Sequence, residues 1–414
     1  MRRRVPLLLL CIVTALGLTA CDWAQLGFDA SNASNNAFEP AFTSSSVTQL
    51  STVWSQPCRC GRVLVANGRV YGVDESTPGT AAVRAFDAER GAPEWSRAFT
   101  SSPPLTTVQL DAIAGGLVYL VVGRTVVALD AATGSTAWSV DPPAPGTGTI
   151  SLDHLVVDES GFPSGGAAST TAFVDVTAAI SNANPVSEIS AIDRTGRITW
   201  SVTPGGQSAG FGGVNTDDQP DSTQRTLDVV SMITTVQPPV LLLTQYDEGG
   251  GRLLHQVVIG PGGPTTSFPP PDRVAAANGL VYFVQVMPRN AVDLFATDPA
   301  TGRVVWTGLG GGLYAIAHGT VVSGVTGPVT GLVALDAHTG QVVWQVPGAA
   351  GPAVAASVLF DTLNGVIEAR DLTTGTRLGS FSVATEALGP ATPSEGLLYA
   401  SSAQQLYAVA PTGH

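Results

Sequence analysis

A nine-residue frame that recurs along the chain constrains the fold more than any other feature. It starts at an Asp, has Gly four residues later and Trp eight residues later. Four segments match it fully: Asp87, Gly91 and Trp95; Asp130, Gly134 and Trp138; Asp298, Gly302 and Trp306; and Asp336, Gly340 and Trp344. Three segments match in degraded form: Asp193, Gly196 and Trp200, one residue shorter; Asp371 and Gly375, with Gly379 at the Trp position; and Asp247 and Gly251, with His255 there. Internal repetition of this kind indicates an array of equivalent structural units.

Each frame has the chemistry of a β-hairpin. The Asp carboxylate accepts hydrogen bonds from free N–H groups of the turn, and Gly takes a positive φ without a Cβ clash. The Trp on the following strand is a large flat side chain that fills the gap between neighbouring sheets. A second hairpin precedes several frames, with turns at Asn67-Gly68, Asn278-Gly279 and Glu395-Gly396. Two hairpins make a four-stranded antiparallel unit, and such units arranged radially form a β-propeller.

Composition agrees with an all-β chain. The 414 residues include 47 Gly and 29 Pro, so turns are dense and long helices are not expected. Hydrophobic residues make up 44% and charged residues 12%, which excludes a disordered, highly charged chain.

The frame resembles the repeat of the PQQ-like (quinoprotein alcohol dehydrogenase-like) β-propellers, in the form Ala-x-Asp-x-x-Thr-Gly-x-x-x-Trp. The segment from Asp22-Trp23 to Gly27, followed by Val47 to Trp54, is similar to the opening of many such proteins. The resemblance covers residues 22 to 410 and implies the fold, whereas it does not specify an activity.

The positions of Trp, or of the residue that replaces it, predict the number of blades. Seven repeats carry their own outer strand, whereas the C-terminal piece Gly396 to Ala410 has none after it. The strand Leu50 to Ser55, with Trp54, can supply it from the other end of the chain and leave no open sheet edge. We therefore predict eight blades. Seven remains the alternative, since residues 203 to 258 form the weakest repeat.

The N-terminus predicts export. Three Arg at positions 2 to 4 precede an apolar run from Val5 to Ala20, which is typical of a secretory signal. The run ends in Leu18-Thr19-Ala20-Cys21, which resembles the lipobox of bacterial lipoproteins and implies cleavage before Cys21 and a diacylglycerol on its sulfur. The alternative is an ordinary signal peptide or short anchor with a chance cysteine. Asp22 resembles a retention signal for the inner membrane of some diderm bacteria, so which membrane carries the anchor stays open.

These features divide the chain into four parts. Residues 1–20 are the predicted signal peptide, and residues 21–49 are the lipidated tether and lead-in. Residues 50–410 are the propeller, which the N-terminal strand closes, and residues 411–414 are a tail. The expected location is the outer face of the cytoplasmic membrane, or the periplasm.

Cys58 and Cys60 remain after processing, in an oxidising compartment where thiols pair. A structural disulfide or two idle thiols is the favoured interpretation, and a redox site is the alternative. We expect no metal there, because the five His residues, at positions 154, 255, 318, 338 and 414, are scattered.

Long connections mark where binding is expected. The tight Asn-Gly and Thr-Gly turns predict one plain face, and the long segments lie on the other. They are 74–81, 141–149, 203–225, 260–273 and 287–292. Asp217, Asp218 and Asp221 lie within 203–225, where a solvated loop is favoured over a Ca²⁺ site.

Charge and residue types exclude several functions. The formal net charge is −13, which opposes binding to nucleic acid. All 19 basic residues are Arg, so a lysine Schiff base and a P-loop lysine are excluded.

Two functional hypotheses follow. The first is a non-catalytic, lipid-anchored scaffold that binds an envelope protein or polymer on its loop-rich face; in size, anchoring and repeat the chain resembles the lipoprotein propeller of the outer-membrane β-barrel assembly machinery. A propeller that senses carbohydrate or another substrate is not separable from it by sequence. The second is a PQQ-dependent dehydrogenase with a Ca²⁺ ion, which the resemblance allows. Those enzymes typically carry two adjacent cysteines against the quinone, whereas this chain has Cys58-Arg59-Cys60, and their metal ligands find no matching positions. We therefore expect no cofactor and assign no catalytic residue.

Overall fold

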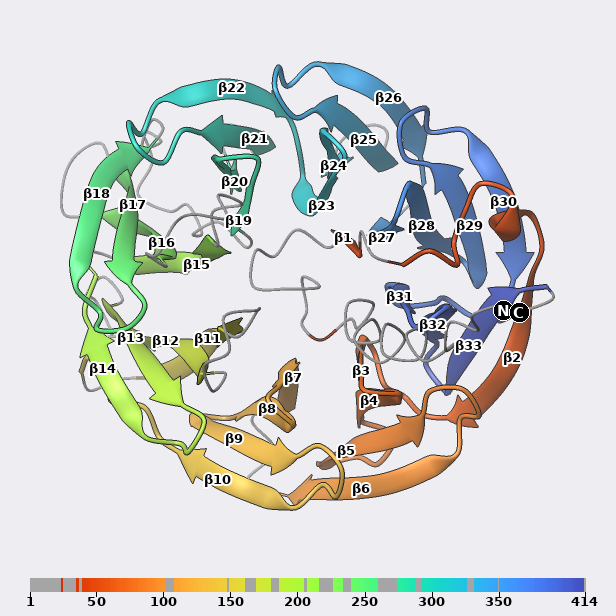
Figure 1. Ribbon diagram of the computed structural model, residues 1–414, viewed down its shortest axis with the longest axis horizontal. Helices are drawn as coiled ribbons and strands as arrows, with labels where there is room; N and C mark the ends of the chain where they lie inside the picture. The colour runs from red at the N-terminus through yellow and green to blue at the C-terminus, as the bar shows by residue number, and fades with distance from the viewer. Residues whose placement is uncertain are drawn as a thin grey trace, which may run out of the picture.

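A computed structural model of the chain describes residues 24, 35–36, 39–100, 108–146, 149–160, 169–179, 186–204, 207–215, 226–233, 240–259, 274–286, 292–325, 331–348 and 350–412. The described residues form eight antiparallel sheets of four strands, one of which gains a short fifth strand. The sheets stand as blades around a central axis, with the first strand of each blade toward the centre and the last at the rim (Figure 1). The predicted eight-bladed β-propeller is therefore confirmed.

Blades 1 to 4 follow one another along the chain. Blade 1 consists of β3 (Val63–Ala66), β4 (Arg69–Asp74), β5 (Thr80–Asp87) and β6 (Pro93–Thr100). Blade 2 consists of β7 (Val108–Ala114), β8 (Leu117–Val122), β9 (Thr125–Asp130) and β10 (Thr136–Val140). Blade 3 consists of β11 (Thr149–Ser160), β12 (Ser169–Ala179), β13 (Val186–Asp193) and β14 (Ile198–Val202). Blade 4 consists of β15 (Gln207–Asn215), β16 (Thr226–Ile233), β17 (Val240–Asp247) and β18 (Leu253–Ile259).

Blades 5 to 8 complete the ring. Blade 5 consists of β19 (Val274–Ala277), β20 (Leu280–Val286), β21 (Val292–Thr297) and β22 (Val304–Leu309). Blade 6 consists of β23 (Gly312–Ala317), β24 (Thr320–Val325), β25 (Gly331–Asp336) and β26 (Val342–Pro347). Blade 7 consists of β27 (Ala350–Ala355), β28 (Val358–Leu363), β29 (Val366–Asp371) and β30 (Arg377–Ser382). Blade 8 consists of β31 (Thr392–Ser394), β32 (Leu397–Ser401), β33 (Gln405–Pro411) and β2 (Leu50–Pro57).

Blade 8 joins the two ends of the chain. β2 pairs antiparallel with β33, and Trp54 lies opposite Ala408. The ring of Trp54 packs against that of Tyr399 on β32, with the ring centroids 6.0 Å apart. The edge of β33 is therefore covered by the N-terminal strand, as the sequence predicted.

The lead-in before β2 is also part of the fold. β1 (Asn35–Asn36) pairs in parallel with β27 as the innermost strand of the blade 7 sheet, and a short 3-10 helix, η1 (Ser46–Thr48), precedes β2. Phe42 and Val47 are fully buried in the core shared by blades 7 and 8. Residues 21–49 were predicted as a tether and lead-in, and the described part of them packs into the ring.

The core lies between neighbouring blades. Middle strands are buried along nearly their whole length, as in β25, whereas outer strands such as β26 alternate between exposed and buried positions. This burial fits strands rich in Val, Leu and Ala that are covered on both faces by adjacent sheets.

One prediction about loops is wrong. The stretch 203–225 was taken as a single long connection, but residues 207–215 form β15, the inner strand of blade 4. The segment 216–225, outside the described residues, therefore follows the first strand of blade 4 and precedes its second strand, β16. The apolar residues of β15 alternate with Gly and Ser, which hides the strand in the sequence. Asp217, Asp218 and Asp221 lie outside the described residues, as does Cys21.

Candidate functional site

The two ends of the ring differ in their connections. The turn face, as we name it, carries the first-to-second and third-to-fourth turns of the blades, such as Asn67-Gly68 and Asp87 to Gly91. The loop face carries the second-to-third turns and the connections between blades, such as Asp74 to Thr80 and Cys58 to Arg62. Asn67 and Gly68 have φ of 54° and 72°, the left-handed values that a tight hairpin turn requires.

The repeat residues of neighbouring blades dock onto one another at the turn face. Each indole N–H donates to the carbonyl of the residue directly after the Asp in the next blade, at 2.8 to 3.0 Å: Trp54 to Ala88, Trp95 to Ala131, Trp138 to Arg194, Trp200 to Glu248, Trp306 to Ala337, and Trp344 to Leu372. The indole ring lies against the Gly of that same turn, so closely that a Cβ on Gly134 would meet Trp95 at 2.5 Å. The sequence predicted that the Trp fills the gap between neighbouring sheets, but it did not predict this hydrogen bond or the packing on the Gly of the next blade. The nearly constant spacing of Asp, Gly and Trp was the signal for it.

The repeat carboxylates hold their own turns. Asp130 accepts hydrogen bonds from the backbone N–H groups of Ala132 and Thr133 and from the Thr133 hydroxyl, at 2.8 to 3.1 Å. The Thr133 hydroxyl and N–H lower the pKa of Asp130, and Thr339 does the same for Asp336. These residues have a structural role in the described fold, and Gly302 and Asp298 form the equivalent turn of blade 5.

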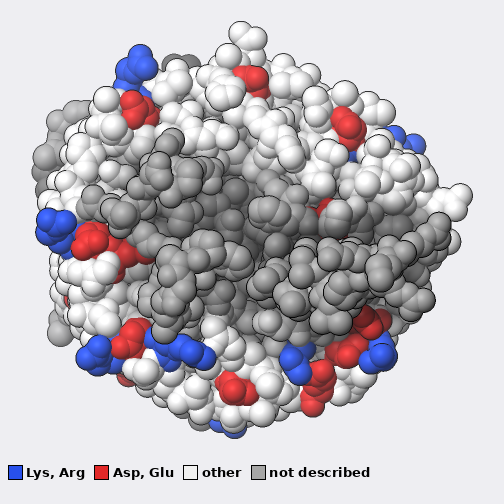
Figure 2. All heavy atoms as spheres, viewed as in Figure 1, with Lys and Arg blue, Asp and Glu red and all other residues white. Residues whose placement is uncertain are grey.

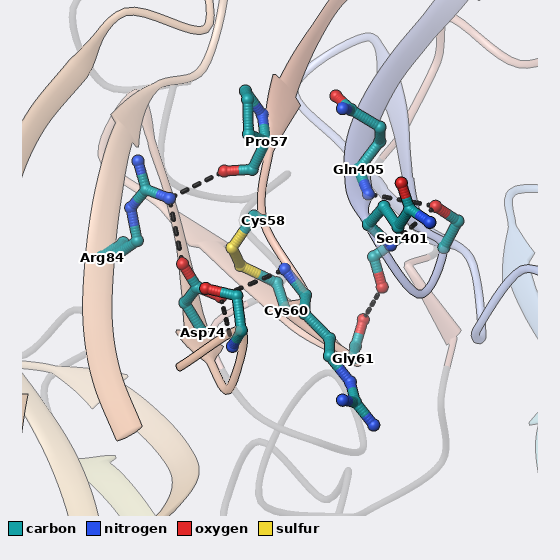
Figure 3. The surroundings of a disulfide bond; sticks show 12 residues. Pro57, Cys58, Cys60, Gly61, Asp74, Arg84, Ser401 and Gln405 are labelled. Carbon is teal, nitrogen blue, oxygen red and sulfur yellow. Dashed lines mark hydrogen bonds and ion pairs between the residues drawn. A yellow bond between two sulfur atoms is a disulfide. The ribbon is translucent and has the colours of Figure 1, made fainter. Parts of the chain in front are cut away.

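Cys58 and Cys60 lie in the connection from β2 to β3 and are joined by a disulfide (Figure 3). Both are buried, at 2% and 3% exposed. The N–H of Cys58 donates to the carbonyl of Gln404 on the neighbouring turn, and the sulfur of Cys60 lies over Gly72 of β4. The disulfide therefore sits where the closing strand of blade 8 passes into blade 1.

An ion pair supports the same connection. Arg84 Nη1 lies 3.1 Å from Asp74 Oδ2 and donates to the carbonyl of Pro57 at 2.7 Å (Figure 3). Asp74 Oδ1 accepts from the N–H of Arg59 at 3.2 Å. These bonds fix the residue before the disulfide loop and the middle residue of the loop to blade 1.

Several buried carboxyl groups were missed by the sequence analysis, and two of them accept a hydrogen bond from a Gln side chain. Asp111 lies on the inner strand β7 and Asp228 on the second strand β16, and they are 2% and 0% exposed. Gln109 Nε2 donates to Asp111 at 2.6 Å, and Gln245 Nε2 donates to Asp228 at 2.9 Å. Burial raises the pKa of each carboxyl to about 7. An Asp in a strand that is otherwise largely apolar was the available signal for these groups. The sequence alone did not show that the carboxyl group is buried.

A third buried carboxyl group is paired with a cation. Asp361 of β28 lies 2.9 Å from Arg370 Nε of β29, and Glu368 contacts the same guanidinium. Burial raises the pKa of Asp361, and the hydrogen bond from Arg370 acts in the opposite direction. This arrangement is that of an internal ion pair that stabilises blade 7.

The described residues do not fit the quinone site that the family resemblance allows. The disulfide between Cys58 and Cys60 is buried, and the sulfur of Cys60 lies against Gly72 of β4. Within the described ranges, no three His, Cys, Asp or Glu side chains converge as metal ligands. We therefore derive no catalytic step from such a group.

Charge is spread thinly over the surface. On the face shown in Figure 2, basic and acidic side chains alternate around the rim of the described part, without a field of one sign.

No helix within the described ranges has the length and apolar character needed to cross a membrane.

A protein-family model described as "Outer membrane protein assembly factor BamB" matches residues 46–164 and 290–378, which is half of the chain. No curated protein sequence matches this chain. The matched segments contain blades 1 and 2, parts of blades 3, 5 and 7, and all of blade 6.

Solved structures share the fold. Quinohemoprotein alcohol dehydrogenase from Comamonas testosteroni is 14% identical, with a TM-score of 0.66 over 97% of this chain and 82% of that one. BamB from Moraxella catarrhalis is 16% identical, with a TM-score of 0.55 over 89% of this chain and 99% of that one. The computationally designed Ika8 protein is 14% identical, with a TM-score of 0.57 over 86% of this chain and 98% of that one. An enzyme, an assembly factor and a designed protein share this architecture, so the fold alone does not indicate the activity.

Proposed function

The chain belongs to the PQQ-like β-propeller family whose model is described as outer membrane protein assembly factor BamB, and on this premise we propose that it is a lipid-anchored extracytoplasmic scaffold. It binds an envelope protein or polymer on the loop face and catalyses no reaction. The observation that carries the proposal is the family match in a chain that opens with an export signal ending in Leu18-Thr19-Ala20-Cys21.

The architecture supports binding on the loop face. Connections between blades and from second to third strands end there, on a scaffold held together by interlocked turns and indoles at the opposite face. Residues such as Ser76 and Ala403 are exposed on it. Variable connections on a rigid frame are the usual place for recognition.

The chemistry of the described residues supports a binding role over dehydrogenation. Within the described ranges the disulfide is buried, and no three His, Cys, Asp or Glu side chains converge as metal ligands. The resemblance to a quinohemoprotein alcohol dehydrogenase at 14% identity is a likeness of fold.

The anchor is tested by expressing the full chain and its Cys21→Ser variant in a diderm bacterium. We expect the wild-type chain to partition into the detergent phase, and its N-terminal peptide to carry the mass of a diacylglycerol. The variant should lose both properties. A wild-type chain without the added mass would contradict lipid anchoring.

The binding role is tested with a photo-crosslinking amino acid placed at Ser76 or Ala403 on the loop face, and at Ala132 on the turn face as the matched control. A discrete crosslinked partner from the loop face and none from Ala132 is the expected result. Stoichiometric binding of added PQQ, with Ca²⁺-dependent oxidation of an alcohol, would instead identify a dehydrogenase and overturn the proposal.

A further inference from the structure

Two described parts of the N-terminal segment contact inner strands of the ring. The N–H of Ile113, on the inner strand β7 of blade 2, donates to the carbonyl of Ala24 at 2.7 Å. Asn35 and Asn36 pair with Val354 and Ala355 of β27, the first strand of blade 7. Both contacts are next to first-to-second turns, so both lie at the turn face.

Buried polar side chains fasten this segment. Asn36 is 0% exposed, donates through Nδ2 to the carbonyl of Pro393 at 3.2 Å, and accepts at its carbonyl from the N–H of Ala356 at 3.0 Å. Glu39 is 1% exposed and accepts from the N–H groups of Ala41 and Gly396, at 3.0 and 2.9 Å. The lead-in is therefore fixed to blades 7 and 8 at the turn face before the chain continues into β2.

Chain length places the anchor on the same side. Cys21 precedes Ala24 by three residues, which span about 11 Å at most. β8 of blade 2, with six residues, spans about 20 Å between the two faces. A lipid on Cys21 consequently lies at the turn face, near blade 2, and does not reach the loop face.

Side chains of both charges stand at this face. The Asp residues of the repeat turns are half-buried, and carboxylates such as Asp130 and Asp336 are occupied by N–H groups of their own turns. Exposed arginines stand in or beside these turns: Arg90, Arg194, Arg197, Arg252, Arg303 and Arg377. The side chains of Arg90 and Arg197 are 76% and 78% exposed, although each lies near its own turn's Asp. Glu89 and Glu94 are exposed carboxylates in or beside the same turns, and Arg377 Nη1 lies 3.3 Å from Glu368 Oε1.

We propose that the turn face is the membrane-facing surface of the propeller. The ring lies with this face toward the bilayer, held there by the lipid on Cys21. The loop face then points away from the membrane, toward partners. This inference rests on the lipid anchor of the proposed function and adds an orientation to it.

The test uses four variants of the full, lipidated chain, each with one added cysteine. Ala132→Cys and Ala300→Cys place a reporter on the turn face, and Ser76→Cys and Ala403→Cys place the matched reporter on the loop face; all four positions are exposed. Each variant is labelled with a fluorophore and reconstituted into vesicles of phosphatidylcholine and phosphatidylglycerol that carry a quencher on the headgroup. We expect quenching at Ala132 and Ala300 to exceed that at Ser76 and Ala403 at least twofold.

The experiment distinguishes a failure of the proposed orientation from a failure of the lipid anchor. Stronger quenching at the loop face, or equal quenching at both faces, in a chain that remains bound to vesicles would overturn the orientation and leave the lipid anchor intact. A wild-type chain that does not bind vesicles would overturn the anchor and the orientation together.

Discussion

Gly379 on β30 and Val47 in η1 occupy the place that an indole and its docking turn hold between other blades. A Cβ on Gly379 would overlap the carbonyl oxygen of Val47. Blade 8 has no Asp-to-Gly turn because β33 and β2 come from opposite ends of the chain, and η1 lies there instead. The missing Trp of the seventh repeat is thus a consequence of how the ring closes.

Substitution of Gly379 should therefore destabilise the protein even when it restores the repeat. Gly379→Trp forces an indole into space filled by Val47 and Phe381, and overpacking of this kind costs about 1–3 kcal/mol. Chemical denaturation of Gly379→Trp and of the exposed control Ser380→Ala measures the difference. Wild-type stability in Gly379→Trp would contradict the assigned contact.

The docking of Trp95 on Gly134 can be separated from backbone strain. Gly134 and Gly68 both have φ near 70°, but a Cβ on Gly134 would meet the indole, whereas one on Gly68 would meet nothing within 4 Å. Gly134→Ala should lose more free energy of unfolding than Gly68→Ala, by about 1–3 kcal/mol. Equal losses of stability for the two variants in thermal denaturation would contradict a contribution of the contact between Trp95 and Gly134.

Removal of the disulfide should have a modest effect. The bond closes a loop of three residues, for which loop entropy gives about 1–2 kcal/mol. Cys58→Ala combined with Cys60→Ala should lower the free energy of unfolding by this amount and keep the fold. Dithiothreitol should destabilise the wild-type chain and leave the double variant unchanged; an equal effect on both would show that the bond is absent in the protein.

Asp228 predicts a dependence of stability on pH. Burial raises its pKa to about 7 in the folded protein, against about 3.9 for an unfolded Asp. Between these values the folded state binds the extra proton, so the free energy of unfolding falls as pH rises and levels off above pH 7. Asp228→Asn, which keeps the hydrogen bond from Gln245, should match the wild type near pH 4 and exceed it at pH 8, by on the order of 2–4 kcal/mol. Asp111→Asn is the matched comparison, and parallel pH profiles for wild type and Asp228→Asn would contradict the assignment.

Much of the fold follows from the sequence because its signals are local. Asp, Gly and Trp at fixed spacing define each outer hairpin, and the unpaired C-terminal strands predict the closing role of Trp54. The docking of each indole onto the carbonyl after the next Asp depends on the angle between blades, which no single repeat encodes. Likewise, the depth of Asp111 and Asp228 follows from neighbouring sheets, and β15 was hidden by its Gly and Ser residues.

The most direct test of the account is crosslinking of the two chain ends across blade 8. Ser51 lies opposite Ala410 in the pairing of β2 with β33. Oxidation of the double variant with Ser51→Cys and Ala410→Cys should join residues 51 and 410 by a disulfide. The control double variant carries Ser51→Cys and Ser139→Cys, with the second cysteine on β10 of blade 2, and should form no such crosslink. If the first pair stays unlinked in folded protein, the N-terminal strand does not close the ring, and both the eighth blade and the placement of the anchor are wrong.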